Sequence, residues 1–269
     1  RKLPAMTRMI VISNQKGGVA KTTSCLSLGG CLAEMGKTVL LIDLDPQANL
    51  TQSLGLKPDS LRRTIGDALL GNDSMVSVSR ESSVHGLDII PANEGLLLLD
   101  KILYGRPNYQ FRLRNGLQSM ESSFYDFVLM DCPSSLGTLT VNALTAAELL
   151  IIPIQCEYYA SRTLKHFLAM VQRVQEKTNP QLTYRVLVTM YDMRNKICRV
   201  VLDQMQQGLQ DALFETIIGV DTKLRESPAF GQPINLYAPN TRATEQYRAL
   251  AGEILDHSGE ELTNYGKEA

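Results

Sequence analysis

Six short, almost continuously apolar runs recur along the chain, at 9–12, 38–42, 87–91, 124–131, 149–154 and 184–190. Runs of this kind, with little polar alternation, are typical of strands buried on both faces in a parallel sheet. Apolar residues at helical spacing fill 24–35, 164–176 and 241–256, and shorter helices are expected at 64–70, 95–103 and 109–121. Strands alternating with helices predict an α/β fold, a doubly wound and mainly parallel sheet with helices on both faces.

The pattern shows no internal repeat, so we expect a single domain over residues 9–256. Residues 1–8 are expected to be a disordered extension, and 257–269 form a polar tail. No apolar run approaches the 18 residues that a membrane-spanning helix needs. Together with the lack of a signal-peptide pattern, this predicts a cytoplasmic protein.

Composition changes this picture little. The net charge of −1 implies no polyanion partner, so any contact with nucleic acid must come from a local patch or from assembly. The five cysteines are scattered without a Cys-x-x-Cys pair, which argues for a reducing compartment and against a disulfide frame or a zinc site.

The most informative stretch follows the first apolar run. It reads Ser-Asn-Gln-Lys-Gly-Gly-Val-Ala-Lys-Thr-Thr over 13–23 and leads into a helical pattern. A glycine-rich turn between a strand and a helix holds phosphates, because its backbone N–H groups and the helix dipole face the anion. Lys21 would neutralise the β- and γ-phosphates and the Thr22 hydroxyl would sit on Mg²⁺. The predicted nucleotide-binding residues are Gly17, Gly18, Val19, Ala20, Lys21, Thr22 and Thr23.

This loop departs from the standard phosphate loop, since Gln15 and Ala20 stand where that pattern has glycine. The methyl group of Ala20 is expected near the phosphate oxygens, where it would slow hydrolysis. A second lysine, Lys16, precedes the glycine pair. With this Lys-Gly-Gly-x-x-Lys-Thr signature the sequence resembles the ParA/MinD family of deviant Walker A ATPases, and in particular its ParA/Soj type.

Two later strands end in carboxylates, at Asp43 and Asp131. Ligands of open α/β sheets bind beyond the carboxyl ends of the strands, so both acids are expected beside the phosphates. Asp131 ends a strand of the Walker B kind and would hold Mg²⁺ through water. The segment Asp43-Leu44-Asp45-Pro46-Gln47 is similar to a family switch segment, and by that resemblance Asp43 would orient the attacking water. Asp45 has an alternative role as the N-cap of a helix starting at Pro46.

The resemblance implies a mechanism. Lys16 would reach the ATP of a second subunit, so that two chains sandwich two ATP molecules with Mg²⁺ and turn over slowly on their own. This homodimer would bind DNA without sequence preference and lie on the nucleoid. A ParB-like or cargo-adaptor protein would stimulate hydrolysis and release it, which segregates DNA or spaces a protein cargo.

The DNA-binding candidates are Arg194, which matches a family position, and Lys223. The family's Ile-Pro-Arg-Asn-x-Arg segment keeps only its second basic position here, as Lys223, because Gly219 and Val220 replace its proline and first arginine.

Three alternatives stay open. A MinD-like membrane-cycling ATPase needs a basic amphipathic C-terminal helix, which the tail lacks, so no stable membrane association is expected. An ATP-dependent synthetase or an iron–sulfur reductase would share the fold class. A nucleotide-gated scaffold with little turnover would share the binding site.

Overall fold

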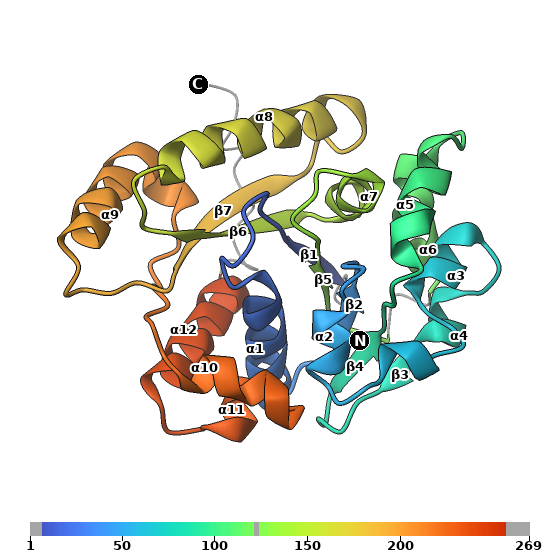
Figure 1. The fold of residues 1–269 in the computed structure, drawn as a ribbon, viewed down its shortest axis with the longest axis horizontal. Helices are drawn as coiled ribbons and strands as arrows, with labels where there is room; N and C mark the ends of the chain where they lie inside the picture. The colour runs from blue at the N-terminus through green and yellow to red at the C-terminus, as the bar shows by residue number, and fades with distance from the viewer. Residues whose placement is uncertain (1–6, 121–123, 257–269) are drawn as a thin grey trace, which may run out of the picture.

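The computed structural model describes residues 7–120 and 124–256, which form one twisted sheet flanked by helices (Figure 1). Within this part of the chain the sheet has seven strands, in the order β3-β4-β2-β5-β1-β6-β7. All neighbours pair in parallel except the short edge strand β3, which runs antiparallel to β4. The strands are β1 Arg8–Ile12, β2 Val39–Asp43, β3 Arg80–Glu81, β4 Leu87–Ile90, β5 Phe127–Asp131, β6 Leu149–Gln155 and β7 Thr183–Thr189.

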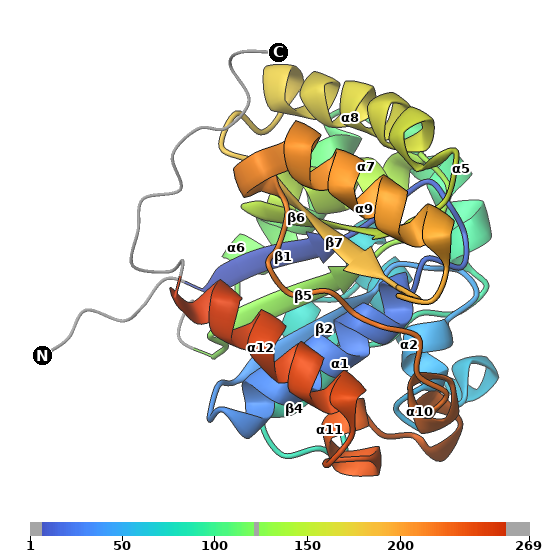
Figure 2. The same cartoon turned by 90° about the vertical axis from the view of Figure 1, so that its left-hand side faces the viewer.

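The helices divide between the two faces of the sheet (Figures 1 and 2). One face is covered by α3 Ile65–Leu70, α4 Met75–Val78, α5 Leu96–Tyr104, α6 Arg112–Gln118, α7 Thr138–Ala146, α8 Ala160–Lys177 and α9 Lys196–Leu209. The other face is covered by α1 Lys21–Glu34, α2 Asn49–Gln52, α10 Lys223–Glu226, α11 Ile234–Tyr237 and α12 Arg242–Asp256. This arrangement confirms the doubly wound, mainly parallel fold.

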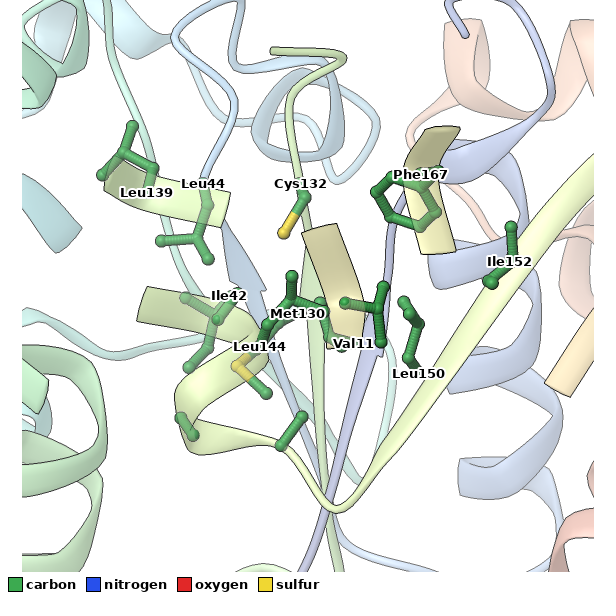
Figure 3. Packing of buried hydrophobic residues seen from close by; sticks show 14 of the residues in the cluster. Val11, Ile42, Leu44, Met130, Cys132, Leu139, Leu144, Leu150, Ile152 and Phe167 are labelled. Carbon is green, nitrogen blue, oxygen red and sulfur yellow. The ribbon is translucent and has the colours of Figure 1, made fainter. Parts of the chain in front are cut away.

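Alternate strand residues enter two separate cores, because successive side chains of a strand point to opposite faces. Val11, Ile42 and Met130 pack with α7 and α8, where Leu144 and Phe167 close over them (Figure 3). Their neighbours Ile10 and Leu41 pack under α1 and α12 instead. Burial on both faces is the reason the strands read as continuous apolar runs.

The predicted strands are all present, with small shifts at their ends. The sheet pairing begins at Arg8, one residue inside the segment expected to be disordered, and the fourth apolar run forms a strand only from Phe127. The helix expected at 109–121 is broken into a 3₁₀ turn, Tyr109–Phe111, and α6. The tail at 257–269 lies outside the described residues, as do residues 1–6.

The first strand lies in the interior of the sheet, between β5 and β6. β1 pairs with β5 in the register Ile12 with Asp131, and with β6 in the register Ile12 with Ile151. The strand order changes direction here, which is where open α/β sheets place their ligands. In the described part of the chain, no helix is long and apolar enough to cross a membrane.

Candidate functional site

The loop from Ser13 to Ala20 leaves the carboxyl end of β1 and enters α1 (Figure 2). The buried Asn14 side chain fixes it, because its Nδ2 donates to the carbonyl of Pro153 at 2.7 Å and its Oδ1 accepts from the Lys16 N–H at 3.0 Å. Gly18 has φ of +73°, a left-handed conformation that glycine adopts without strain. The loop is therefore held as a turn at the edge of the sheet.

Lys21, the first residue of α1, turns back into this loop. Its Nζ donates to the carbonyl of Lys16 at 3.2 Å and to Ser134 Oγ at 2.8 Å. Burial lowers the pKa of Lys21, and the negative charges of Asp131 and Asp45 oppose that shift. The ammonium group thus sits inside the turn, where a phosphate anion would supply the counter-charge.

A cavity of about 550 Å³ opens between this loop and the segments that follow β2 and β5. Gly17, Gly18, Ala20, Lys21, Thr22 and Thr23 all line it. Val19 differs, because its side chain is fully buried and its carbonyl accepts from Thr189 Oγ1 at 3.0 Å. The predicted loop residues other than Val19 therefore border one cavity, and the side chain of Val19 does not reach it.

A second, smaller cavity of about 200 Å³ adjoins the first. Gly18, Ala20 and Thr23 line both cavities, and Met190, Ile218 and Tyr247 line the second one alone. Its mainly apolar walls suit the flat face of a base, whereas the first cavity has the charges that suit phosphates.

Ala20 has φ of 65° and ψ of 33°, which is the left-handed region. A side chain with a Cβ is strained there, and glycine is not. The standard phosphate loop thus has glycine at this position because glycine adopts the left-handed conformation without strain. Ala20 adopts the same conformation at a cost in energy.

Replacing Ala20 by glycine is expected to stabilise the protein by about 1 kcal/mol, since relief of strain outweighs the added freedom of the unfolded chain. Urea denaturation of the two proteins would measure this difference. The same change removes a methyl group from the phosphate cavity, so ATP turnover should rise. A less stable glycine variant would contradict the interpretation of strain.

Thr22 and Asp131 form the predicted metal-binding pair. The Thr22 hydroxyl donates to Asp131 Oδ2 at 2.6 Å across the gap between α1 and β5. Asp131 Oδ1 is buried and has no hydrogen-bond partner among the described residues. Burial and the nearby charge of Asp43 raise the pKa of Asp131 well above its usual range. A carboxylate oxygen without a donor beside a hydroxyl is a fitting place for a hydrated Mg²⁺.

Asp43 lies below the cavity instead of in it. Its side chain is fully buried, and Oδ2 accepts from the Thr51 N–H at 2.8 Å and the Thr51 hydroxyl at 2.7 Å. Oδ1 accepts from the Asp45 N–H at 3.1 Å. Asp43 does not line the phosphate cavity, so its geometry does not support the predicted role in holding water.

Asp45 occupies the position that the sequence interpretation gave to Asp43. It lines the phosphate cavity together with Lys21 and Thr22, and its side chain is half-buried. Its Oδ1 accepts from the Gln47 N–H at 2.9 Å, and no helix starts at Pro46. Asp43 therefore positions the switch segment, while Asp45 presents its carboxylate to the cavity.

Asp43 should make stability depend on pH. Burial raises its pKa to about 6, although the hydrogen bonds from Thr51 oppose this shift. Since the native state binds this proton more tightly than the unfolded chain, the free energy of unfolding falls as pH rises from about 4 to 6. This contribution amounts to about 3 kcal/mol, at 1.36 kcal/mol per pKa unit.

An Asp43→Asn variant lacks this proton and serves as the reference. We expect the stability difference between the parent and this variant to shift in the parent's favour as pH is lowered from 6 to 4. Urea titrations at a series of pH values would measure it, and a difference independent of pH would refute the assignment.

Lys16 does not point into its own phosphate cavity. Its Nζ pairs with Glu157 Oε2 at 2.5 Å and lies 3.4 Å from Gln155 Oε1, at the end of β6. The Lys16 side chain is 36% exposed and that of Glu157 is 55% exposed, so the pair is solvated and weak. Lys16 is thus free to exchange this partner for another anion.

The predicted DNA-binding residues are separate from the phosphate cavity. Arg194 is highly exposed before α9, and it donates to both oxygens of Asp192 at 2.9 Å. Lys223 is exposed on α10 and pairs with Glu226 at 2.7 Å. The fold therefore does not bring them together with Lys21 and Asp131.

Several exposed apolar side chains lie near the phosphate cavity. Leu97 lines its edge and is 63% exposed, as is its neighbour Leu98. Tyr158 and Tyr159, which follow the partner of Lys16, are 75% and 67% exposed. No sequence signal marked the two leucines, since they lie in a helix with an ordinary apolar pattern.

The chain is similar to several known proteins. A family model described as an AAA domain matches residues 7–184. The sporulation initiation inhibitor protein Soj of Bacillus subtilis is 39% identical over 250 residues, which cover 93% of this chain and 98% of Soj.

Two solved structures are also similar. One is described as cobyrinic acid a,c-diamide synthase from Mycobacterium smegmatis with a bound ATP analogue and magnesium, at 35% identity and a TM-score of 0.79, covering 94% of this chain and 96% of that one. The septum site-determining protein MinD of Pyrococcus horikoshii, complexed with Mg-ADP, shares the fold with a TM-score of 0.75 at 24% identity, covering 94% and 98% of the chains.

Proposed function

The chain belongs to the Soj/ParA family of partition ATPases, and from this premise we propose that it hydrolyses ATP as a nucleotide-dependent dimer that binds DNA and releases it after hydrolysis. The observation that carries the proposal is that Lys21, Thr22 and Asp45 line one cavity at the carboxyl ends of β1, β2 and β5, with Asp131 buried behind it and bonded to Thr22.

In this proposal the triphosphate lies along the loop and the first turn of α1, with Lys21 on its terminal phosphates. Thr22 and Asp131 would hold Mg²⁺, which would neutralise charge that develops on the phosphate oxygens. Asp45 orients the attacking water, and Asp43 keeps the backbone of Asp45 in place through its hydrogen bond. Phosphoryl transfer needs little more than such positioning and charge stabilisation.

Self-association is supported by the face around the phosphate cavity. Exposed apolar groups mark protein–protein interfaces, and Leu97, Leu98, Tyr158 and Tyr159 are such groups. Lys16 extends from the loop to Glu157, which precedes the two tyrosines, and forms a solvated ion pair with it. We propose that a second chain docks here and that Lys16 then contacts the partner's ATP.

DNA binding is supported by local charge, despite the net charge of −1. Helices α8 and α9 pack on the same face of the sheet. Their exposed basic residues, with Arg194 in the preceding loop, outnumber the exposed acids Glu176 and Asp203. The basic residues on the two helices are Arg162, Lys165, Arg173, Lys177, Lys196 and Arg199. Such a stripe suits the phosphate backbone of DNA and gives no base specificity.

The test combines three assays on the purified chain. With ATP and Mg²⁺ we expect slow phosphate release, a shift from monomer to dimer in size-exclusion chromatography, and salt-sensitive co-sedimentation with unrelated DNA duplexes. A chain that hydrolyses ATP yet never binds DNA or dimerises would refute the partition role. A partner that stimulates hydrolysis should be sought among ParB-like and cargo-adaptor proteins.

A second candidate is favoured by one similar structure, since a protein described as a diamide synthase is 35% identical. An ATP-dependent synthetase would consume ATP only when a small carboxylic acid and a nitrogen donor are present. ATP use that depends strictly on such an acid would favour this candidate.

A MinD-like membrane cycle is tested by liposome pelleting with ATP.

A further inference from the structure

A third cavity, of about 650 Å³, lies beside the mainly apolar cavity of about 200 Å³, which we call the base cavity. The two share Gly219 and Val220 as a common wall. The third cavity is bordered by the loop after β7, which carries Asp192 and Arg194, and by the start of α12, which carries Arg242 and Gln246. None of its lining residues lines the phosphate cavity.

Arg242 is built into this cavity by its contacts. Its Nη2 donates to the carbonyl of Val220 at 3.1 Å, which leaves its other N–H groups available. Gly219 allows the guanidinium to come close, because a Cβ at that residue would lie 2.8 Å from Nη2. The Gly219 N–H donates to Gln246 Oε1 at 3.0 Å, which fixes the wall against α12.

The charges around the cavity sum to a positive value. Asp192 is the acid that lines it, and both of its oxygens are taken by Arg194. Arg242 also lies near enough to Asp192 to add to the lowering of its pKa. Among the described residues, no carboxylate forms an ion pair with Arg242. The neighbouring acid Asp221 lines the base cavity instead, where it accepts the Lys223 N–H.

We propose that Arg242 binds a phosphate of the DNA backbone in this cavity and acts together with Arg194. A guanidinium with a free edge binds phosphate through two N–H groups, and Arg242 is exposed to solvent. Two guanidiniums against one carboxylate leave a single excess positive charge, which matches the single negative charge of one backbone phosphodiester. The inference rests on the proposed DNA binding and adds a residue outside the loop before α9.

The test uses Arg242→Gln, because glutamine keeps a polar side chain with N–H donors and loses the charge. Fluorescence anisotropy of a labelled duplex, with ATP and Mg²⁺, would be followed over a range of salt concentrations. We expect affinity to fall about 10-fold and the slope of log K against log salt to fall by about 1. Arg242→Lys should keep the parent slope, and adding Arg194→Ala should lower the slope further.

Arg248→Ala is the matched control. It lies on the same helix, but its guanidinium is paired with Glu34 at 2.8 Å, so DNA affinity should not change. Thermal melting checks that each variant folds. If Arg242→Gln does not fold, Arg242→Lys and Arg242→Met carry the comparison of slopes.

Three results would overturn the inference. The first is a parent that binds DNA while a folded Arg242→Gln variant keeps the same slope. The second is thermal stabilisation of the parent, but not of the Arg242→Gln variant, by inorganic phosphate in the absence of DNA. That result would make this cavity a site for a free anion. The third is an equal loss of affinity in Arg248→Ala. A parent that never binds DNA refutes the proposed function itself, and is recognised before any variant is compared.

Discussion

Replacing Lys21 by alanine is expected to lower the affinity for ATP on the order of 100- to 10,000-fold, because two charge-assisted hydrogen bonds to phosphate are lost at about 1.5–3 kcal/mol each. Lys21 Nζ is already placed inside the loop by the Lys16 carbonyl and Ser134 Oγ. Calorimetric titration with a non-hydrolysable ATP analogue would measure the change. Dimerisation and DNA binding should disappear with it.

Lys16→Ala is the matched control, since it removes a lysine from the same loop. Lys16 points away to Glu157, so a single chain should bind ATP with nearly the parent affinity. Turnover in the dimer should nevertheless fall. Equal ATP affinity in the Lys21→Ala variant would refute the assignment of the phosphate site, and lost affinity in Lys16→Ala would refute its proposed action across the interface.

Replacing Asp45 by alanine is expected to lower turnover on the order of 100- to 1,000-fold, the usual contribution of a carboxylate that positions or activates water. ATP affinity should stay within a few-fold of the parent, because Lys21 and the Thr22–Asp131 pair are untouched. The variant should therefore accumulate as an ATP-bound dimer that stays on DNA. Single-turnover phosphate release measures the chemical step directly.

Asp43→Ala provides the comparison that separates the two acids. It leaves the buried Thr51 N–H without an acceptor and should destabilise the protein by about 3 kcal/mol. As urea is added, the ATPase activity of the Asp43→Ala variant should fall in proportion to the fraction of protein that remains folded. If instead Asp43→Ala folds normally and alone abolishes hydrolysis, the original interpretation of the sequence is correct and Asp45 has no catalytic role.

The different placement of these two acids shows where sequence reasoning reaches its limit. They stand two residues apart at the end of one buried strand, so periodicity and spacing treat them alike. The structure separates them through Thr51, which lies eight residues beyond Asp43 and whose hydroxyl also accepts the Ala92 N–H at 2.9 Å. This tertiary contact has no signature near the two acids.

Other parts of the site were predictable because their signal is local. The turn before α1 has its residues in one stretch, and Thr22 meets Asp131 because β1 and β5 are neighbours whose carboxyl ends coincide. Two further features could not be predicted from the sequence. The strain at Ala20 depends on its backbone angle φ, and the position of the Lys16 side chain depends on Glu157, which follows β6.

The six longer strands were recognised from their apolar runs. The helices α7 and α9 escaped, as did the short helices α2, α4, α10 and α11 and the two-residue strand β3. α7 is buried almost all round, so it lacks the polar face on which helical periodicity depends. α9 does have an exposed polar face, and its apolar positions Cys198, Val201, Leu202 and Met205 follow helical spacing. That signal was available in the sequence and was not used.

The central place of β1 also has a consequence for synthesis on the ribosome. Both neighbours of the first strand come late, since Phe127–Asp131 and Leu149–Gln155 are translated more than a hundred residues after it. At about 5–20 residues per second, β1 must wait several seconds with both edges open. Parallel pairings between such distant segments are slow to form and expose the chain to aggregation. A nascent chain stalled near residue 120 would therefore be a favoured client of chaperones, with its phosphate loop still unformed.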